Sequence, residues 1–247
     1  MEPVLAGKVV VITGASRNIG AALAAGLARA GADLLLVARG REALESTAAE
    51  IRAETAREVV ACVADVATAE GVDQVAAQAA ALPRIDALVN NAAASGDTVG
   101  PLLEQHDAVW EAVLAANLLA PFRLSRALLP RLREQAGASI LNVVSGSGFL
   151  PSPGIGAYGV SKAALWMMTR QLAVELAPRV RVNALCPGLV SPDGQAHHPA
   201  QAALLPSVPL GRIGRPEEMV GAARYLISDE ASYTTGEVLV VNGGRPW

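Results

Sequence analysis

Lysine is scarce in this chain of 247 residues, and cysteine and phenylalanine are equally rare, with two of each. Only Lys8 and Lys162 are lysines among its 20 basic residues, so the other 18 (20 − 2) are arginines. A compact ammonium differs from a planar guanidinium in reach and hydration. A lysine retained in such a chain therefore marks a position where an ammonium group is favoured, and Lys162 is the candidate for such a position.

Cysteine, strong charge and long apolar runs are also scarce. Cys62 and Cys186 are the only cysteines, each in an apolar strand-like run, which excludes a disulfide framework or cysteine metal site and favours a reducing cytoplasm. The net charge of −3 gives no electrostatic attraction to nucleic acid or to an anionic membrane. The N-terminal residues predict no signal peptide, and the apolar runs are too short and broken to predict a bilayer span.

Apolar β-branched runs alternate along the chain with helical patterns. The strands are predicted at residues 8–13, 33–38, 59–63, 86–90, 139–144, 180–185 and 237–241. The helices are predicted at residues 19–30, 41–57, 68–82, 104–133 in two pieces, 157–176 and 216–227. This alternation predicts an α/β fold with a doubly wound parallel sheet of about seven strands and helices on both faces. No repeat or linker interrupts it, so residues 1–247 are interpreted as one domain, with a substrate lid around residues 189–207.

Sites in such sheets lie beyond the carboxyl ends of the strands. The first strand is followed by the turn Thr13-Gly-Ala-Ser-Arg-Asn-Ile-Gly20, whose small residues let the backbone approach a pyrophosphate at a helix N-terminus. The second strand ends at Arg39, whereas its acidic residue, Asp33, lies at the opposite end. Guanidinium groups at Arg17 and Arg39 suit a 2′-phosphate, which favours NADP(H) and leaves NAD(H) as the alternative.

Tyr158 and Lys162 lie four residues apart at the start of a predicted helix, so their side chains share one face. A neighbouring ammonium favours the phenolate and is expected to lower the pKa of the phenol, which suits Tyr158 to proton transfer. Ser145 follows the fifth predicted strand and could bring its hydroxyl beside that phenol.

Together these motifs resemble the short-chain dehydrogenase/reductase family over almost the whole chain. Its TGxxxGxG turn matches Thr13, Gly14 and Gly20, and its NNAG segment matches residues 90–93. The resemblance implies four catalytic residues, which are Asn117, Ser145, Tyr158 and Lys162. It implies a cofactor site made of Gly14, Ser16, Arg17, Asn18, Ile19, Gly20, Arg39, Asp65, Val66, Asn91, Ala92, Tyr158, Lys162, Pro187, Gly188 and Val190. No metal site is predicted.

Three positions depart from the family pattern. Asn18 replaces the middle glycine of the turn, and asparagine tolerates a left-handed backbone well, so the turn is expected to survive. Ala93 replaces the glycine of NNAG. Pro192 stands where the family often has a threonine that bonds the nicotinamide amide, so Ser191 or a backbone group must substitute for it.

The resemblance implies that Tyr158 donates a proton to a ketone that receives hydride from the nicotinamide. Ser145 would bond the same oxygen, Lys162 would bond the ribose, and Asn117 would hold a water that relays protons. The favoured function is an NADPH-dependent reductase of a carbonyl substrate. The alternatives are an NAD-dependent alcohol dehydrogenase, a pteridine-reductase-like enzyme, and a nucleotide-binding sensor or scaffold without activity.

Residues 94–100, 146–156 and 189–207 are expected to select the substrate. Ser147 is interpreted as a turn residue, and His197 and His198 as solvated lid residues rather than metal ligands. The expected partners are a small carbonyl or alcohol and further copies of the chain, as a tetramer or dimer, with no nucleic acid and no membrane. Scarce lysine beside abundant alanine and arginine favours a GC-rich bacterial genome.

Overall fold

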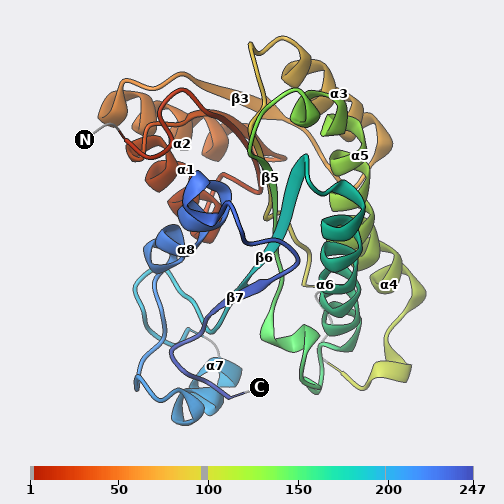
Figure 1. Ribbon diagram of the computed structural model, residues 1–247. Coiled ribbons are helices and arrows are strands. Elements are labelled where there is room, and N and C mark those ends of the chain that lie inside the picture. The colour runs from red at the N-terminus through yellow and green to blue at the C-terminus, as the bar shows by residue number, and fades with distance from the viewer. Residues whose placement is uncertain (1–2, 96–99, 198, 247) are drawn as a thin grey trace.

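A seven-stranded, entirely parallel sheet in the order β3-β2-β1-β4-β5-β6-β7 forms the centre of the computed structural model, which describes residues 3–95, 100–197 and 199–246 (Figure 1). The strands are β1 (Val9–Thr13), β2 (Asp33–Ala38), β3 (Val59–Val63), β4 (Ala87–Asn90), β5 (Ala138–Val143), β6 (Val180–Pro187) and β7 (Val238–Val241). The predicted doubly wound sheet is therefore confirmed. The boundaries of β2 and β3 agree with the prediction, and those of the other strands differ by one or two residues.

The principal helices are α1 (Asn18–Arg29), α2 (Arg41–Thr55), α3 (Ala69–Ala80), α4 (Asp107–Leu114), α5 (Ala120–Arg133), α6 (Gly156–Leu176), α7 (Pro199–Leu204) and α8 (Val220–Ile227). The two predicted pieces between residues 104 and 133 are joined by the π-helical turn Ala115–Leu119. The predicted helix 216–227 begins as a 3-10 turn, Pro216–Met219, before α8. Thr68 caps α3 as predicted, because its hydroxyl accepts the Gly71 N–H at 3.0 Å.

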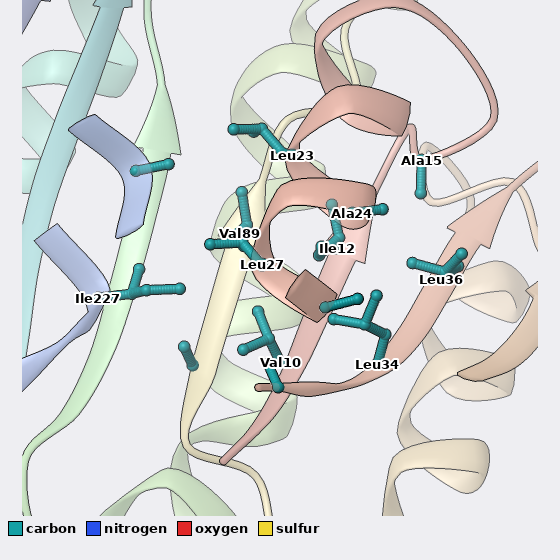
Figure 2. Close-up of a cluster of buried hydrophobic side chains, with 14 of the residues drawn as sticks. Val10, Ile12, Ala15, Leu23, Ala24, Leu27, Leu34, Leu36, Val89 and Ile227 are labelled. Carbon is teal, nitrogen blue, oxygen red and sulfur yellow. The ribbon is translucent and has the colours of Figure 1, made fainter. Parts of the chain in front are cut away.

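Alternate residues of the strands build a separate apolar core on each face of the sheet. Val10 and Ile12 point into the core that α1, α2 and α8 cover, as Figure 2 shows for the part around α1. Val9 and Val11 point into the core beneath α3, α5 and α6. Both faces are covered, so the buried strands consist of continuous apolar runs rather than alternating apolar and polar residues.

The chain reverses direction across the sheet between β1 and β4. From β1 it winds outward through β2 to β3, then crosses to β4 and winds outward through β5 and β6 to β7. In open sheets of this kind, ligands bind beyond the carboxyl ends of the strands at the point where the strand order reverses, which here lies between β1 and β4. Thr13 and Asn90 end these two strands, so the fold places the first glycine turn and the residues after β4 at one site.

The stretch Asp107–Arg133 corrects one expectation, because it is long and apolar enough to cross a membrane by length and composition alone. Its inner face is nevertheless a core face, with Leu124, Leu128 and Leu132 buried against the sheet. The prediction considered apolar runs one at a time, whereas the π-helical turn joins two of them into one continuous helix. The burial indicates a core helix of this fold.

Candidate active site

The turn between β1 and α1 has the backbone that phosphate binding requires. Asn18 has φ +48° and Gly14 has φ +66°, so asparagine does occupy a left-handed position as predicted. A β-carbon on Gly20 would lie 2.0 Å from the Gly14 carbonyl oxygen, so only glycine lets the helix start this close to the turn. The N-cap residue Arg17 makes no capping bond, and the first turn of α1 has no acidic residue. The helix therefore presents N–H groups and a positive dipole that fit a pyrophosphate.

Hydrogen bonds to Thr13 join this turn to the segment after β4. Its hydroxyl oxygen accepts the main-chain N–H groups of Asn91 and Ala92, both at 3.0 Å. In return the Asn91 amide donates to the carbonyl oxygens of Thr13 at 2.9 Å and Gly14 at 3.2 Å. The two segments on either side of the reversal in strand order are thus held as one unit.

The carboxyl end of β2 carries positive charge. Arg39 is exposed there, and its guanidinium lies 3.8 Å from the Asp65 carboxylate after β3. Asp65 in turn accepts the Ala67 N–H at 3.0 Å, which orders the start of the segment that leads to α3. Asp33 lies at the opposite end of β2, as predicted, where it is 3.8 Å from Arg57. This edge therefore offers three exposed guanidinium groups, Arg17, Arg39 and Arg41, and one carboxylate, Asp65, which is paired with Arg39.

Ser145, Tyr158 and Lys162 meet where β5 ends against α6. The Ser145 hydroxyl lies close enough to the phenol of Tyr158 to lower the pKa of that phenol. The Lys162 ammonium lies over the Tyr158 ring, 5.6 Å from its centroid, and donates to the Val143 carbonyl oxygen at 2.8 Å. The structure thus brings together three of the four residues that the resemblance assigns to catalysis.

The prediction that the pKa of Tyr158 is lowered is wrong. Burial raises the pKa of Tyr158 above its ordinary value of 10.0, while the Ser145 hydrogen bond opposes that effect. The ammonium of Lys162 faces the ring and the Val143 carbonyl, and burial lowers the pKa of Lys162 to about 8. The prediction considered only the charge of the lysine and omitted the desolvation of both groups. Tyr158 is therefore a protonated phenol at neutral pH.

Asn117 lies in the π-helical turn and is fully buried. Its amide oxygen accepts the Ala94 N–H at 2.7 Å, and its amide nitrogen donates to the Ala94 carbonyl oxygen and to the Ser161 hydroxyl, both at 2.9 Å. Ser161 donates onward to the carbonyl oxygen of Tyr158 at 2.7 Å. Asn117 thereby joins the segment after β4 to α6. The water relay stays a prediction, and both hydrogens of the Asn117 amide are already engaged.

Two further residues belong to this cluster that the sequence does not identify. Ser161 is polar and fully buried between Tyr158 and Lys162, and only the fold reveals its bond to Asn117. Cys186, in β6, is close enough to affect the charge of both Tyr158 and Lys162, and burial raises the pKa of its thiol to about 11. The sequence signal that could have pointed to Cys186 is its position at the end of a strand, immediately before Pro187. The thiol is therefore a neutral neighbour of the ammonium.

The segment after β6 closes the same edge. Pro187 ends β6, and a β-carbon on Gly188 would lie 2.5 Å from the Asn242 α-carbon, so the backbone of this segment packs directly on the chain after β7. Val190 pairs with Gly214 in an isolated parallel bridge. Ser191, the proposed substitute for the missing threonine, is buried and donates to the Gln195 carbonyl oxygen at 2.7 Å. Its hydroxyl is therefore committed to the lid itself.

The remaining predictions fall within the lid and the loops. Ser147 lies in a 3-10 turn, Gly146–Gly148, as predicted, and its hydroxyl accepts from that of Ser152 at 3.0 Å. His197 is exposed and lies 2.7 Å from the Asp193 carboxylate. His198 and residues 96–99 of the predicted substrate loop lie outside the described residues. Within the described part of the chain, no group of three or more His, Cys, Asp or Glu residues could hold a metal ion.

Apart from Tyr158 and Lys162, which lie on α6, the predicted cofactor residues end or follow strands at the carboxyl edge of the sheet. Gly14, Ser16, Arg17, Asn18, Ile19 and Gly20 follow β1, Arg39 follows β2, Asp65 and Val66 follow β3, Asn91 and Ala92 follow β4, and Pro187, Gly188 and Val190 end or follow β6. The parallel sheet therefore gathers residues that are far apart in the sequence. Their contacts with a nucleotide stay a prediction.

Comparison with known proteins agrees with this geometry. A family model described as enoyl-(acyl carrier protein) reductase matches residues 14–245. Human dehydrogenase/reductase SDR family member 4 is 36% identical, over 98% of this chain and 88% of that protein. A 3-oxoacyl-[acyl-carrier-protein] reductase from Synechocystis sp. is 37% identical, over 97% of each chain. The structure of L-sorbose reductase from Gluconobacter frateurii, complexed with NADPH and L-sorbose, has a TM-score of 0.90 and 34% identity, covering 99% of this chain and 98% of that chain.

Proposed function

Because the chain belongs to the short-chain dehydrogenase/reductase family of NAD(P)-dependent oxidoreductases, we propose that it reduces a ketone with NADPH, and that Tyr158 is the general acid. The observation that carries this proposal is the placement of the Ser145 hydroxyl next to the Tyr158 phenol, beside the buried ammonium of Lys162. The pair lies at the same edge of the sheet as an uncapped helix N-terminus suited to a dinucleotide.

Three side chains have separate roles in the proposed reduction. A bound reduced nicotinamide supplies the hydride for the carbonyl carbon. Tyr158, which is protonated at neutral pH, donates its proton to the carbonyl oxygen as negative charge develops there. Ser145 donates a hydrogen bond to the same oxygen and holds it in place. The ammonium of Lys162, fixed by the Val143 carbonyl, stabilises the phenolate that Tyr158 leaves behind.

The preference for NADPH over NADH is proposed from the charge at the end of β2. Arg17 and Arg39 are exposed at this edge, and β2 ends without a carboxylate to bond a free ribose 2′-hydroxyl. Guanidinium groups bind phosphate by paired, charge-assisted hydrogen bonds. The similar L-sorbose reductase was crystallised with NADPH, which agrees with this assignment.

The test is a panel of carbonyl compounds assayed with NADPH and with NADH through nicotinamide absorbance. The panel should contain a 3-oxoacyl thioester, a keto sugar and an oxidised pteridine. Reduction with NADPH favoured over NADH is the expected result. A preference for NADH would instead favour an NAD-dependent alcohol dehydrogenase. A complete lack of hydride transfer would favour a nucleotide-binding sensor or scaffold without activity.

We also propose that the chain forms a homo-oligomer, a dimer or tetramer, through α6. Val160, Met167 and Val174 are 47%, 59% and 80% exposed, and their seven-residue spacing puts them on one face of that helix. An exposed apolar stripe of this length suits the same stripe on a second copy. Light scattering should show an assembly that Met167→Glu with Val174→Glu converts to a monomer. A wild-type monomer would contradict the proposal.

A further inference from the structure

The turn that follows Ser145 is packed on α6 through two glycines. A β-carbon on Gly159 would lie 2.7 Å from the Ser147 carbonyl oxygen. A β-carbon on Gly148 would lie 2.8 Å from the Lys162 carbonyl carbon. Both distances are shorter than real β-carbon contacts, and the atoms they would meet belong to the main chain, which cannot rotate away. The turn and the helix can approach this closely only if both positions lack side chains.

This turn determines where the Ser145 hydroxyl lies. Ser145 caps the turn, and its hydroxyl oxygen accepts the Ser147 N–H at 3.3 Å. A main-chain donor therefore occupies one lone pair of that oxygen, and the same hydroxyl lies close enough to Tyr158 to lower the pKa of its phenol. A displacement of the Ser147 peptide groups would carry the Ser145 hydroxyl with it.

Gly159 follows Tyr158 immediately on α6 and is the fourth residue of that helix. Glycine is one of the least favourable residues inside a helix, so its presence there calls for a local reason. The glycine Gly221 in α8 provides a contrast, because a β-carbon there would meet no atom within 4 Å. At Gly159 a side chain is excluded because the turn after Ser145 packs directly against the helix.

We propose that Gly148 and Gly159 are positioning residues for the reaction. By seating the Ser145 turn directly on α6, they set the separation between the Ser145 hydroxyl and the Tyr158 phenol. The inference rests on the proposed function. It adds two residues that affect the rate of the proposed reaction without contacting the substrate or the nucleotide.

The kinetic experiment compares Gly159→Ala with Gly221→Ala, a matched helical glycine that has room for the methyl group. Gly159→Ala should lower kcat on the order of tenfold to a hundredfold, as small misplacements of reacting groups do, with the Kd for NADPH within about twofold of wild type. Gly221→Ala should keep the wild-type kcat. Gly148→Ala, which approaches the same contact from the turn, should lower kcat in the same direction and serves if Gly159→Ala does not fold.

A double variant separates positioning from a general structural defect. If Gly159 acts through Ser145, then Ser145→Ala with Gly159→Ala should lose no more activity than Ser145→Ala alone. Additive losses in the double variant, or wild-type kcat in Gly159→Ala, would overturn the proposal. The pH profile of kcat should also shift to higher pH in Gly159→Ala, because the Ser145 hydrogen bond lowers the pKa of Tyr158.

Crystal structures of the wild type and Gly159→Ala give a readout that needs no substrate. The Ser147 carbonyl should move away from α6, and the Ser145 and Tyr158 oxygens should separate. An unmoved turn would overturn the positioning role whatever the activity. A wild-type protein that transfers no hydride would contradict the proposed function alone, because the two structures still test the packing.

Discussion

The ammonium of Lys162 donates to the main-chain oxygen of Val143 over 2.8 Å, with almost the whole side chain removed from solvent. This bond joins α6 to the end of β5, two residues before Ser145. Taking an ammonium out of water disfavours its charged form, and one carbonyl oxygen offsets only part of that loss. Burial accordingly lowers the pKa of Lys162 from 10.5 to about 8.

This lowered pKa predicts how stability depends on pH. Below about pH 8 the lysine is charged in both states, so folding carries the full penalty of burying the charge. Between about 8 and 10.5 the unfolded chain holds the proton more often than the folded chain, so the contribution of Lys162 to the free energy of unfolding rises with pH. The expected slope is at most about 1.4 kcal/mol per pH unit.

Urea unfolding of the wild type and Lys162→Met at about pH 7 and about pH 9 measures this contribution, because the variant cannot titrate at this position. The stability of the wild type relative to the variant should increase over that interval. A difference that stays constant would show that the lysine keeps its ordinary pKa in the folded protein.

Replacing Tyr158 by phenylalanine should remove the proton donor and leave nucleotide binding largely intact. The variant retains the ring under the Lys162 ammonium, so packing changes little. We expect kcat to fall by at least about 10³-fold, at the upper range for loss of a general acid. Steady-state rates and NADPH titration by fluorescence measure the two effects. A variant that keeps most of the wild-type kcat would refute the assignment of Tyr158.

Reversing the charge at Arg39 should shift the cofactor preference. Arg39→Asp removes a guanidinium that suits a 2′-phosphate and introduces a carboxylate that suits a free hydroxyl. The Kd for NADPH should rise by roughly tenfold to a hundredfold, as expected for losing a hydrogen bond to a charged group. The Kd for NADH should stay equal or fall.

Arg179→Asp is the matched control for this change. Arg179 is exposed and precedes β6, at the opposite edge of the sheet, so the charge changes equally but far from the nucleotide turn. Parallel loss of NADPH affinity in both variants would indicate a long-range charge effect and argue against a specific phosphate contact.

Thr13 should be important for stability because it satisfies two partly buried main-chain donors at once. Thr13→Val keeps the shape but leaves the N–H groups of Asn91 and Ala92 without that acceptor. The free energy of unfolding should fall by roughly 1–3 kcal/mol for each unsatisfied donor. Thr13→Ser, which retains the hydroxyl, should recover most of the loss in denaturant unfolding. Equal stabilities of the valine and serine variants would contradict this account.

The order of strands and helices could be predicted because the local pattern and the fold agree. The apolar runs of β2 and β3 lie between polar helical patterns, and the parallel sheet buries both of their faces, so the run and the strand coincide. The turn at Asn18 was predictable for the same reason, since the backbone preference of asparagine matches the left-handed position that it occupies.

The helix between residues 107 and 133 was harder to predict. Pro121 lies in the first turn of α5, where its missing N–H is tolerated, and the π-helical turn continues the chain from α4 without a break between the two predicted pieces. The burial of Asn117 inside that turn depends on Ala94 and Ser161, which are distant in sequence. Local residue pattern carries no information about such partners.

By itself, the sequence of this protein determined which residue types follow each strand, and a parallel sheet then assembles those residues on one edge. It therefore determined the family, the nucleotide turn and the candidate proton donor. Only the tertiary structure decided the electrostatic state of the donor, because desolvation depends on everything that surrounds Tyr158 and Lys162. Only the tertiary structure decided, too, that Gly148 and Gly159 meet main-chain atoms across a helix and a turn. Spacing along a chain specifies neighbours on one element, whereas solvation and close packing are properties of all the elements together.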